Sequence, residues 1–265
     1  MNSNDPLLLF HPLPDACVAF STTRRGGVSN GNYGGFNISS TCGDDPLHVL
    51  QNRAALCVKL GVSPERLLLP QQTHEDKCLR IDAGFFSLPP ERRRELLQGV
   101  DALYTAEPGV CVGVSTADCV PLLLYTSDSP CVAAVHAGWR GTVMRITEKV
   151  AGTLIREGHS PGSLWGVIGP SISQAAFEVG DEVYGAFMRA GFPADIARRM
   201  PGADGLEHWH IDLWKANVLQ LERLGVPLEQ IHCSGICTYQ HSDHFFSARR
   251  LGKDCGRIYN GIMLR

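Results

Sequence analysis

The chain of 265 residues lacks the marks of a membrane or secreted protein. No apolar run reaches the roughly 18 residues that a membrane-spanning helix needs. No basic segment precedes the short apolar run near the start, as a signal peptide would require. We therefore expect a cytoplasmic protein without a membrane partner, in a compartment where thiols stay reduced.

Strong positive charge is also missing. Lysine and arginine number 24 against 27 aspartates and glutamates, so the net charge is −3. The arginines cluster only briefly, at 92–94 and 249–250. Binding to a nucleic acid backbone generally needs a broad basic face. We expect no nucleic acid partner.

The ten cysteines contain no Cys-x-x-Cys pair, which excludes a standard zinc ribbon or finger. Most of these thiols are expected to fill the core as small apolar groups. Cys233 and Cys237 lie four residues apart in an expected strand, so the pattern predicts that both face the core from one side.

One helix has clear start and stop signals. Asp45 and Pro46 are a favoured N-cap and first residue, and Gly61 is a typical stop. The apolar spacing predicts that the helix buries the face formed by Leu47, Leu50, Ala54 and Cys57.

Helical and strand patterns alternate along the rest of the chain. Helices are expected at 90–97, 142–157, 174–191 and 212–226. A strand pair is expected around the turn at 71–76, and further strands lie within 101–105, 109–126, 130–137, 163–173, 230–240 and 244–250. Neither an internal repeat nor a linker is visible, and the continuous apolar runs at 120–124 and 132–135 suggest strands covered on both faces. We predict a single α/β (α+β) domain over residues 1–265, with mixed β-sheets flanked by helices.

Reactive residues stand at the ends of the two apolar runs. Asp118 and Cys119 precede one run, and His136 ends the other, before a glycine-flanked turn that carries Arg140 into a helix. Ligands in α/β proteins bind at such strand ends, and a helix start there favours an anion. If the two strands pair, Cys119 and His136 lie close together.

His74, in a polar turn, is a third candidate ligand. One cysteine and two histidines would suit catalytic zinc, which usually has three protein ligands and an open position. The residues alone leave the ordinary interpretations open: a core thiol for Cys119, a satisfied histidine for His136 and a solvated turn for His74.

A resemblance narrows these alternatives. The chain resembles the YfiH/YlmD family, the laccase-domain or "polyphenol oxidase" proteins related to human FAMIN. The resemblance implies zinc bound by His74, Cys119 and His136. Glu75 stands where the family usually has a small residue. The motifs that carry the resemblance occur in this order along nearly the whole chain: STTRRGGVS, QQTH, DAL, TADCVPLLLY, VHAGWRGT, IGPSIS, FEVG, ICTYQ and FFSARR.

The resemblance further implies phosphorolysis of adenosine, inosine and S-methyl-5′-thioadenosine, together with adenosine deamination. Purine nucleosides and phosphate are then the expected partners. Arg24 or Arg25, in a glycine-rich loop with backbone N–H groups, and Arg140 are candidate phosphate ligands. Asn37 is a candidate for binding the ribose or base. Asp118 is a candidate acid/base group, or alternatively a group that supports Cys119.

Other functions are weighed against this one. A copper polyphenol oxidase needs many imidazoles, whereas the chain has a single His-x-His pair, His208 and His210, which would allow only a surface copper site. A cysteine hydrolase that edits peptidoglycan precursors would use Cys119 as nucleophile and His136 as base. A non-enzymatic metal-binding module is the third alternative. The chain could act as a monomer or a homodimer.

The aromatic and basic residues near the C-terminus have ordinary interpretations. Phe245 and Phe246 are expected in the core, with one edge available to stack on a purine. Arg249 and Arg250 are expected on the surface, and the resemblance makes one of them a candidate site residue.

Overall fold

The two apolar runs form the centre of the fold as strands β7 (Val120–Thr126) and β8 (Cys131–Ala137), and every residue of both is buried. The computed structural model describes residues 5–10, 12–202 and 204–265. The two strands pair antiparallel, with Pro121 opposite His136. Leu122 and Leu123 belong to core clusters on opposite faces of the sheet. The prediction that these strands are covered on both faces is confirmed.

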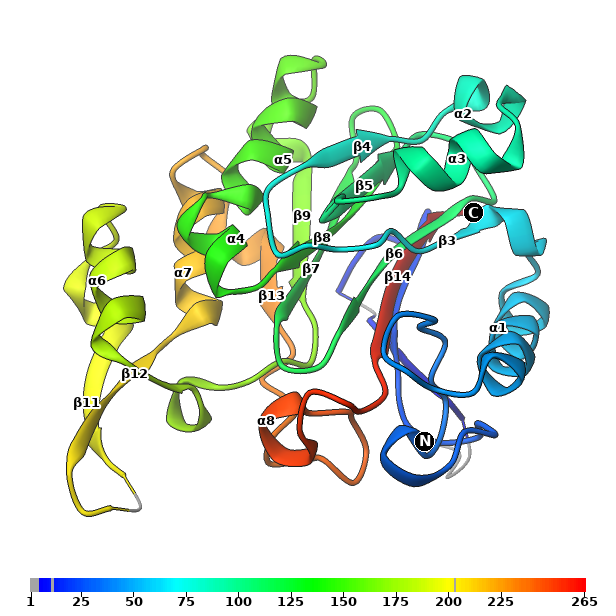
Figure 1. Ribbon diagram of the computed structural model, residues 1–265. Coiled ribbons are helices and arrows are strands. Elements are labelled where there is room, and N and C mark those ends of the chain that lie inside the picture. Colours follow the sequence, from blue (N-terminus) through cyan, green and yellow to red (C-terminus); the bar gives the residue numbers. More distant parts are fainter. Residues whose placement is uncertain (1–4, 11, 203) are drawn as a thin grey trace.

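β7 and β8 lie within a six-stranded sheet that mixes parallel and antiparallel pairs. Helices α5 (Ile146–Arg156) and α7 (Leu213–Glu222) cover one face of it, and α6 (Asp181–Arg189) lies beyond them at the left of Figure 1. The strand order is β13 (Ile231–Cys233), β9 (Leu164–Ile168), β7, β8, β5 (Ala102–Thr105) and β4 (Cys78–Arg80).

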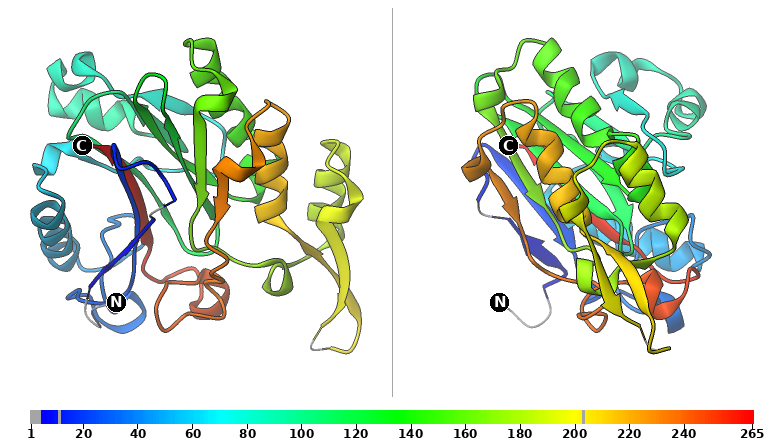
Figure 2. Two further views of the ribbon diagram at one scale, coloured as in Figure 1. Left: turned by 180° about the vertical axis from the view of Figure 1, so that it is seen from behind. Right: turned by 90° about the vertical axis from the view of Figure 1, so that its left-hand side faces the viewer.

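A five-stranded mixed sheet packs against the other face, where Val112, Leu123 and Ile262 share one core cluster. Its order is β1 (Leu7–Leu9), β2 (Cys17–Thr22), β14 (Ile258–Leu264), β6 (Cys111–Thr116) and β3 (Leu67–Leu68). Helix α1 (Pro46–Leu60) covers the outer side of this sheet. The protein thus has four layers, helix, sheet, sheet and helix (Figure 2). The α/β class with mixed sheets flanked by helices is confirmed.

A small antiparallel sheet forms an arm that projects from the body beside α6, at the left of Figure 1. Its order is β10 (Glu178–Val179), β12 (Glu207–Ile211) and β11 (Ala197–Pro201). Exposed Arg198 and Arg199, followed by Pro201, protect the open edge of β11, because charge and proline disfavour pairing with another chain.

Short helices complete the described chain. The α-helices are α2 (Ala83–Ser87), α3 (Pro90–Leu96), α4 (Trp139–Val143) and α8 (Ala248–Leu251). The 3₁₀ turns are Gly31–Tyr33, Pro64–Arg66, Pro161–Ser163, Gln174–Ala176, Ala194–Ile196 and Leu228–Gln230.

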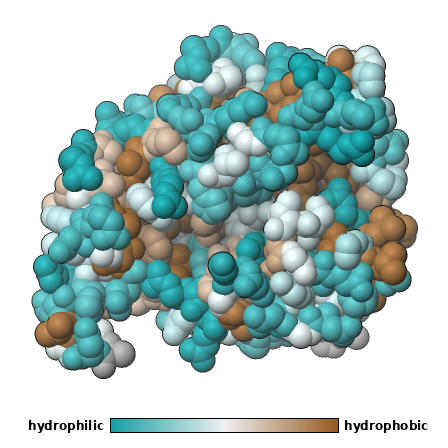
Figure 3. All heavy atoms as spheres, viewed as in Figure 1, coloured by the Kyte–Doolittle hydropathy of each residue, from teal (hydrophilic) through white to brown (hydrophobic). Residues whose placement is uncertain are grey.

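The caps of α1 are confirmed, but its predicted buried face is wrong. The Asp45 side chain accepts a hydrogen bond from the Leu47 N–H, and Gly61 has a left-handed φ of 66°. Leu47 and Leu50 are 66% and 63% exposed. The apolar spheres over α1 at the right edge of Figure 3 match this exposure. The buried face consists of Val49, Asn52, Leu56 and Cys57.

Asn52 explains this choice of face. Its amide nitrogen donates to the carbonyls of Gly35 and Asn37, and its oxygen accepts from the Val28 N–H. These bonds satisfy a buried amide, and they require the Asn52 side of α1 to face the glycine-rich loop.

Four other predictions are corrected. The helix expected at 142–157 breaks at Arg145, whose φ is 62°, into α4 and α5. The helix expected at 174–191 begins only at 181, after a 3₁₀ turn and β10. The segment 244–250 is a loop leading into α8, not a strand. The strands β3 and β4 on either side of the 71–76 turn pair in different sheets, not with each other.

The prediction for Cys233 and Cys237 is also corrected in part. Cys237 is buried, as expected, but β13 ends at Cys233, which is exposed. The alternation of a strand therefore does not extend between them. Phe245 and Phe246 are buried, as expected.

Candidate metal centre

Three segments that are distant in sequence bring His74, Cys119 and His136 together. His74 lies in the turn between β3 and β4, Cys119 lies just before β7, and His136 lies near the end of β8. One potential ligand atom from each lies within 4.8 Å of the other two. The β7–β8 pairing confirms the prediction that Cys119 and His136 lie close together. Burial decreases from His136 to Cys119 to exposed His74, so the cluster opens to solvent on the His74 side.

The backbone around the cluster adopts rare conformations. His74 and Asp118 have φ values of 63° and 91°, in a region that costs non-glycine residues about 1–3 kcal/mol. Gly138 leaves room for the ligands, since a Cβ there would lie 3.1 Å from the Cys119 sulfur and 3.3 Å from a ring carbon of His74. The surrounding contacts therefore impose the positions of His74 and Cys119.

Asp101, at the start of β5, supplies many of these contacts. Its fully buried carboxylate accepts hydrogen bonds from the backbone N–H groups of Thr73, His74 and Glu75, at 3.0–3.1 Å. The same carboxylate lies 2.7 Å from Nδ1 of His136, and the Asp101 carbonyl accepts from the His136 N–H at 2.8 Å. One carboxylate thus orients two of the three candidate ligands.

Asp101 was not among the predicted site residues. The available signal was an acid directly before a short apolar strand, in the segment Asp-Ala-Leu. A carboxylate on Nδ1 leaves Nε2 of His136 as the nitrogen that faces the cluster, an arrangement typical of histidine ligands to metals.

The electrostatics favour a charged cysteine. Burial raises the pKa of the Cys119 thiol, but the charge and hydrogen bond of His136, with those of His74, lower it to about 6. Burial lowers the pKa of His136, but Cys119 and Asp101 raise it to about 9. The pKa of Asp101 is lowered, because the hydrogen bond and charge of His136 and the loop N–H groups outweigh its burial. A thiolate is the form in which cysteine binds metals or attacks as a nucleophile.

Asp118 links the Cys119 turn to the C-terminal part of the chain. One carboxylate oxygen accepts from the Thr238 hydroxyl, and the other accepts from the Arg249 N–H, both at 2.6 Å. Arg249 in turn donates its guanidinium to the carbonyls of Ala176 and Glu178. Arg249 is exposed, as expected, and it also links these segments of the chain.

The glycine-rich loop differs from the expected phosphate cradle. Five of its N–H groups, those of Val28, Ser29, Gly34, Gly35 and Phe36, donate to acceptors within the protein. Arg24 donates to the carbonyls of Gly34 and Ser242, and it lies over the Phe246 ring at 4.9 Å. These five N–H groups are therefore already engaged in hydrogen bonds within the loop and to Asn52 of α1.

The remaining predicted substrate residues lie in three different places. Asn37 is fully buried and bonds Asp44 and the Arg257 N–H, so it offers no exposed surface to a ligand in this conformation. Arg25 lies beside His244, on a pocket whose lining includes none of the cluster residues. Arg140 is exposed in the first turn of α4, directly after the His136 segment, with its guanidinium 4.5 Å from the Trp139 ring centre.

The histidine pair of β12 makes protein contacts. His208 bonds Asp204 at 2.9 Å, and Nδ1 of His210 lies 2.9 Å from the Gln174 carbonyl. Within the described residues, His74, Cys119 and His136 form the one group with the spacing of a metal site.

Known proteins resemble this chain over nearly its full length. Residues 18–265 match the family described as "Multi-copper polyphenol oxidoreductase laccase". A protein of Bacteroides thetaiotaomicron named "Purine nucleoside phosphorylase" is 47% identical, over 92% of this chain and 90% of its own. "Adenosine deaminase RL5", from an unknown prokaryotic organism, is 45% identical over 92% of each chain. The crystal structure of Bacillus licheniformis hypothetical protein YfiH superposes with a TM-score of 0.89 at 28% identity, covering 99% of this chain and 98% of the other.

None of the helices in residues 5–10, 12–202 and 204–265 has the length and apolarity to cross a membrane.

Proposed function

Because the chain belongs to the multi-copper polyphenol oxidoreductase laccase family, and two of its relatives are named for purine nucleoside chemistry, we propose that it is a zinc-dependent purine nucleoside phosphorylase. The observation that carries the proposal is the cluster of His74, Cys119 and His136, open to solvent on one side. The proposed substrates are adenosine, inosine and S-methyl-5′-thioadenosine, and adenosine deamination is a second proposed activity of the same centre.

The three donors fit a zinc ion. One thiolate and two imidazoles are common zinc ligands, and three protein ligands are typical of catalytic rather than structural zinc. Bound zinc would supply a Lewis acid at the mouth of the cluster. Asp101 would hold the His136 ring and the His74 turn in place for it, as carboxylates behind histidine ligands do.

Arg140 is the proposed phosphate ligand. It stands four residues after His136, and an exposed guanidinium can bind a phosphate through two parallel hydrogen bonds. In phosphorolysis, a phosphate oxygen forms a bond to C1′ of the ribose while the C1′–N9 bond breaks. The bonding electrons leave with the purine, which takes up a proton, and the sugar leaves as its 1-phosphate: ribose 1-phosphate from adenosine and inosine, and the 5-methylthio analogue from S-methyl-5′-thioadenosine.

Asp118 has two proposed roles. Its bonds to Thr238 and Arg249 support a positioning role for the turn that carries Cys119. An acid/base role in deamination would use the lone pairs that these two bonds leave on the carboxylate oxygens.

A cysteine hydrolase is the second candidate, and one observation favours it. The lowered pKa of Cys119 beside His136 is also the arrangement of a thiolate nucleophile and its base. Metal content separates the two proposals, because a zinc ligand cannot serve at the same time as a free nucleophile. A copper oxidase is weaker, since two histidines and one cysteine fall short of a type 1 plus trinuclear copper set.

The test is a nucleoside panel. Purified protein is incubated with phosphate and each nucleoside, products are separated by chromatography, and bound metals are measured by mass spectrometry. We expect free purine and the corresponding sugar 1-phosphate, and about one zinc per chain. No product from any nucleoside would contradict the proposal.

Cys119→Ala should remove both zinc and phosphorolysis. Cys237→Ala is the matched control, since Cys237 is buried, bonds Ser173 and lies outside the cluster, so it should keep its zinc. Full phosphorolysis in the Cys119 variant would contradict both the zinc and the nucleophile proposals.

A further inference from the structure

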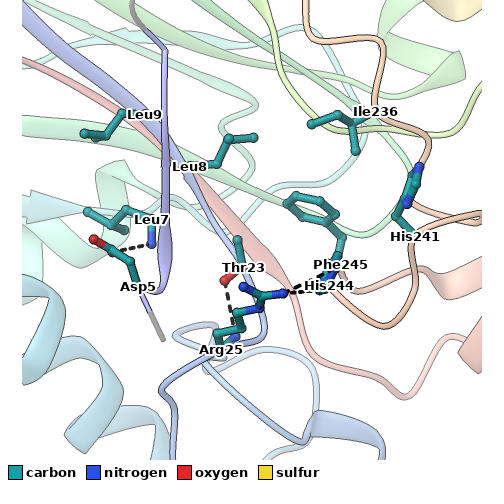
Figure 4. Close-up of a pocket in the computed structure, with 10 residues that line it drawn as sticks. All are labelled: Asp5, Leu7, Leu8, Leu9, Thr23, Arg25, Ile236, His241, His244 and Phe245. Atoms are coloured by element: carbon teal, nitrogen blue, oxygen red, sulfur yellow. Dashed lines mark hydrogen bonds between the residues drawn. The ribbon is translucent and has the colours of Figure 1, made fainter. Parts of the chain in front are cut away.

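Several cavities of the protein contain an arginine, and they differ in the charges around it. One, of about 450 Å³, lies between edge strand β1 and the segment that follows edge strand β13 (Figure 4). Asp5 lines it together with Arg25, so both signs of charge are present. A second cavity contains Arg80 and Glu157, which pair with each other at 3.5 Å. In both of these cavities an acid accompanies the arginine.

A third cavity has arginines without an acid. It has a volume of about 200 Å³ and lies between α1, α3 and the segment after β3, in the right half of Figure 1. Arg53 of α1 and Arg94 of α3 line it, and no aspartate or glutamate among the described residues does. Neither the cluster residues nor Arg140 line it. Because sites for drug-sized molecules usually have about 300–1,000 Å³, this cavity suits a smaller ligand.

Arg53 brings a positive charge that has no acidic partner. Its Nη2 donates to the Leu67 carbonyl at 3.3 Å, and no other hydrogen bond or ion pair joins its side chain to the part of the chain that the structure describes. Its Nε and Nη1 atoms are not buried, so both are open to solvent. A guanidinium with free N–H groups and no carboxylate beside it favours an anionic ligand.

The acids of the neighbouring segments have partners of their own. Glu91 pairs with Arg94 at 3.2 Å, within α3. Glu95 of the same helix pairs with Arg92 at 2.6 Å. Asp44, before α1, accepts hydrogen bonds from two side chains of the glycine-rich loop. Arg53 therefore sets the charge that a ligand in this cavity meets, and Arg94 adds further N–H donors.

Neutral hydrogen-bond donors stand beside these arginines. Ser40 and Gln71 line the cavity and are exposed, and the side chain of neither bonds another described residue. The loop that carries Ser40 is held in place by Asn37. The buried Asn37 amide donates to the Ser39 carbonyl at 3.3 Å and accepts from the Ser39 N–H at 3.2 Å. Donors on a loop with such support lose little freedom when a ligand binds.

From this juxtaposition we propose that the cavity binds a tetrahedral oxyanion, either free phosphate or the phosphate group of a monoester. Arg53 bonds the anion, and the donors of Ser40, Gln71 and Arg94 bond the oxygens that remain. A phosphate group offers at least three strong acceptor oxygens, which matches donors that come from four segments of the chain. The site is separate from the phosphate position proposed at Arg140, and it does not depend on the phosphorylase reaction.

Isothermal titration calorimetry on the Arg140→Ala protein tests the class of ligand, because this protein lacks the phosphate position proposed beside the metal centre. We expect inorganic phosphate and sulfate to bind, and acetate, with two oxygens, to bind at least about 10-fold more weakly, the loss of one hydrogen bond to a charged group. Acetate binding as tight as phosphate binding would overturn the tetrahedral class.

Methyl phosphate separates the two sources of the anion. If it binds as tightly as inorganic phosphate, the site accepts phosphate monoesters. If it binds more weakly, the site is one for free phosphate. No binding of either probe would overturn the proposal.

Arg53→Gln, added to the Arg140→Ala protein, should weaken phosphate binding about 10- to 100-fold. Arg94→Gln should weaken it about 2- to 5-fold, because an exposed charge that already has a partner contributes less. Arg92→Gln is the matched control, since Arg92 is exposed on the same helix and pairs with a glutamate but does not line the cavity. Unchanged affinity in the Arg53 variant, or equal losses in the Arg92 and Arg94 variants, would overturn the proposal.

The wild-type protein provides a test that does not depend on a folded variant. Amide shifts in ¹⁵N spectra during a phosphate titration should include Ser40, Thr41 and Gln71. Shifts confined to the segment from His136 to Arg140 would overturn this site and leave the proposed phosphorylase reaction intact. Because no nucleoside is present, a failure of phosphorolysis in the nucleoside panel would leave the expected shifts unchanged.

Discussion

Asp101 organises the candidate metal centre more than any ligand does. It accepts hydrogen bonds from three successive N–H groups of the His74 turn and from the His136 ring. The turn has a left-handed residue at His74, so its shape needs outside support. The carboxylate provides this support and selects the His136 nitrogen that faces the cluster.

Asp101→Asn should lower zinc affinity about 10- to 100-fold, the usual cost of losing a partner behind a histidine ligand. An amide cannot accept all the bonds that the carboxylate accepts, so the His74 turn loses its support. Zinc affinity is measured by competition with a chromogenic chelator. Asp76→Asn, on the same turn but paired with Lys149 at the surface, is the control and should bind zinc as the wild type does. Equal affinities in all three proteins would show that Asp101 does not position the ligands.

Arg140→Ala should raise the KM for phosphate about 10- to 100-fold with zinc content unchanged, because it removes a charge-assisted contact of about 1.5–3 kcal/mol. Adenosine deamination uses no phosphate, so it should suffer less than phosphorolysis. Steady-state kinetics on both reactions make the comparison. Arg156→Ala, an exposed arginine at the end of α5, is the control. A parallel loss of both activities would instead assign Arg140 a role in placing the nucleoside.

At the scale of one element, α1 shows how a helix with two apolar faces is oriented. Leu47 and Leu50 lie on one face, and Val49 and Leu56 lie on the other, which is the buried one. Apolar spacing alone does not distinguish them. Asn52 does, because its amide bonds backbone groups of the glycine-rich loop and places its own face inward.

Leu56→Ala should lower the free energy of unfolding by about 2–5 kcal/mol, since Leu56 is fully buried and the variant leaves a cavity. Leu50→Ala, the same change on the exposed face, should lie within about 0.5 kcal/mol of the wild type. Urea denaturation monitored by circular dichroism measures both. Similar losses in the two variants would mean that the exposed face is covered in solution.

At the scale of the whole molecule, antiparallel pairing brings distant segments to the same end of the sheets. The end of β6, the start of β7 and the end of β8 meet there, and the turns before β4 and β7 add His74 and Cys119. At the opposite end of β7 and β8, Asp128 in their connecting turn bonds the His159 ring and the Ser160 N–H. Hydrogen bonds between loops thus hold the chain in place at both ends of the β7–β8 pair.

The Asp128 contact predicts a pH dependence of stability. Burial raises the pKa of Asp128, but the bonds from His159 and Ser160 lower it well below its usual range. As the pH falls, the Asp128 carboxylate takes up a proton near pH 3.9 in the unfolded chain and only at a lower pH in the folded chain. The stabilisation from this contact is therefore present above about pH 3.9 and is lost as the pH falls further. The free energy of unfolding of Asp128→Asn should fall less steeply than that of the wild type between about pH 5 and pH 2. Urea denaturation across this range checks it, and matching slopes would refute it.

The sequence by itself determined the features that depend on neighbouring residues. The caps of α1, the two continuous apolar strands and the short connection between them all follow from local chemistry, and each is present. The pairing of β7 with β8 then places Cys119 near His136, as the sequence predicted. The motifs around these residues were enough to indicate the family.

Only the tertiary structure decided the features that depend on contacts between distant residues. Asp101 is ordinary in sequence and becomes central because β5 pairs with β8 and begins beside the His74 turn. Strand β14 lies at the centre of the five-stranded sheet between β2 and β6, far from both in sequence. The buried face of α1 likewise depends on a loop that precedes it. In each case the free energy comes from satisfying buried polar groups and covering apolar surface across the fold, and no short stretch of sequence contains both partners.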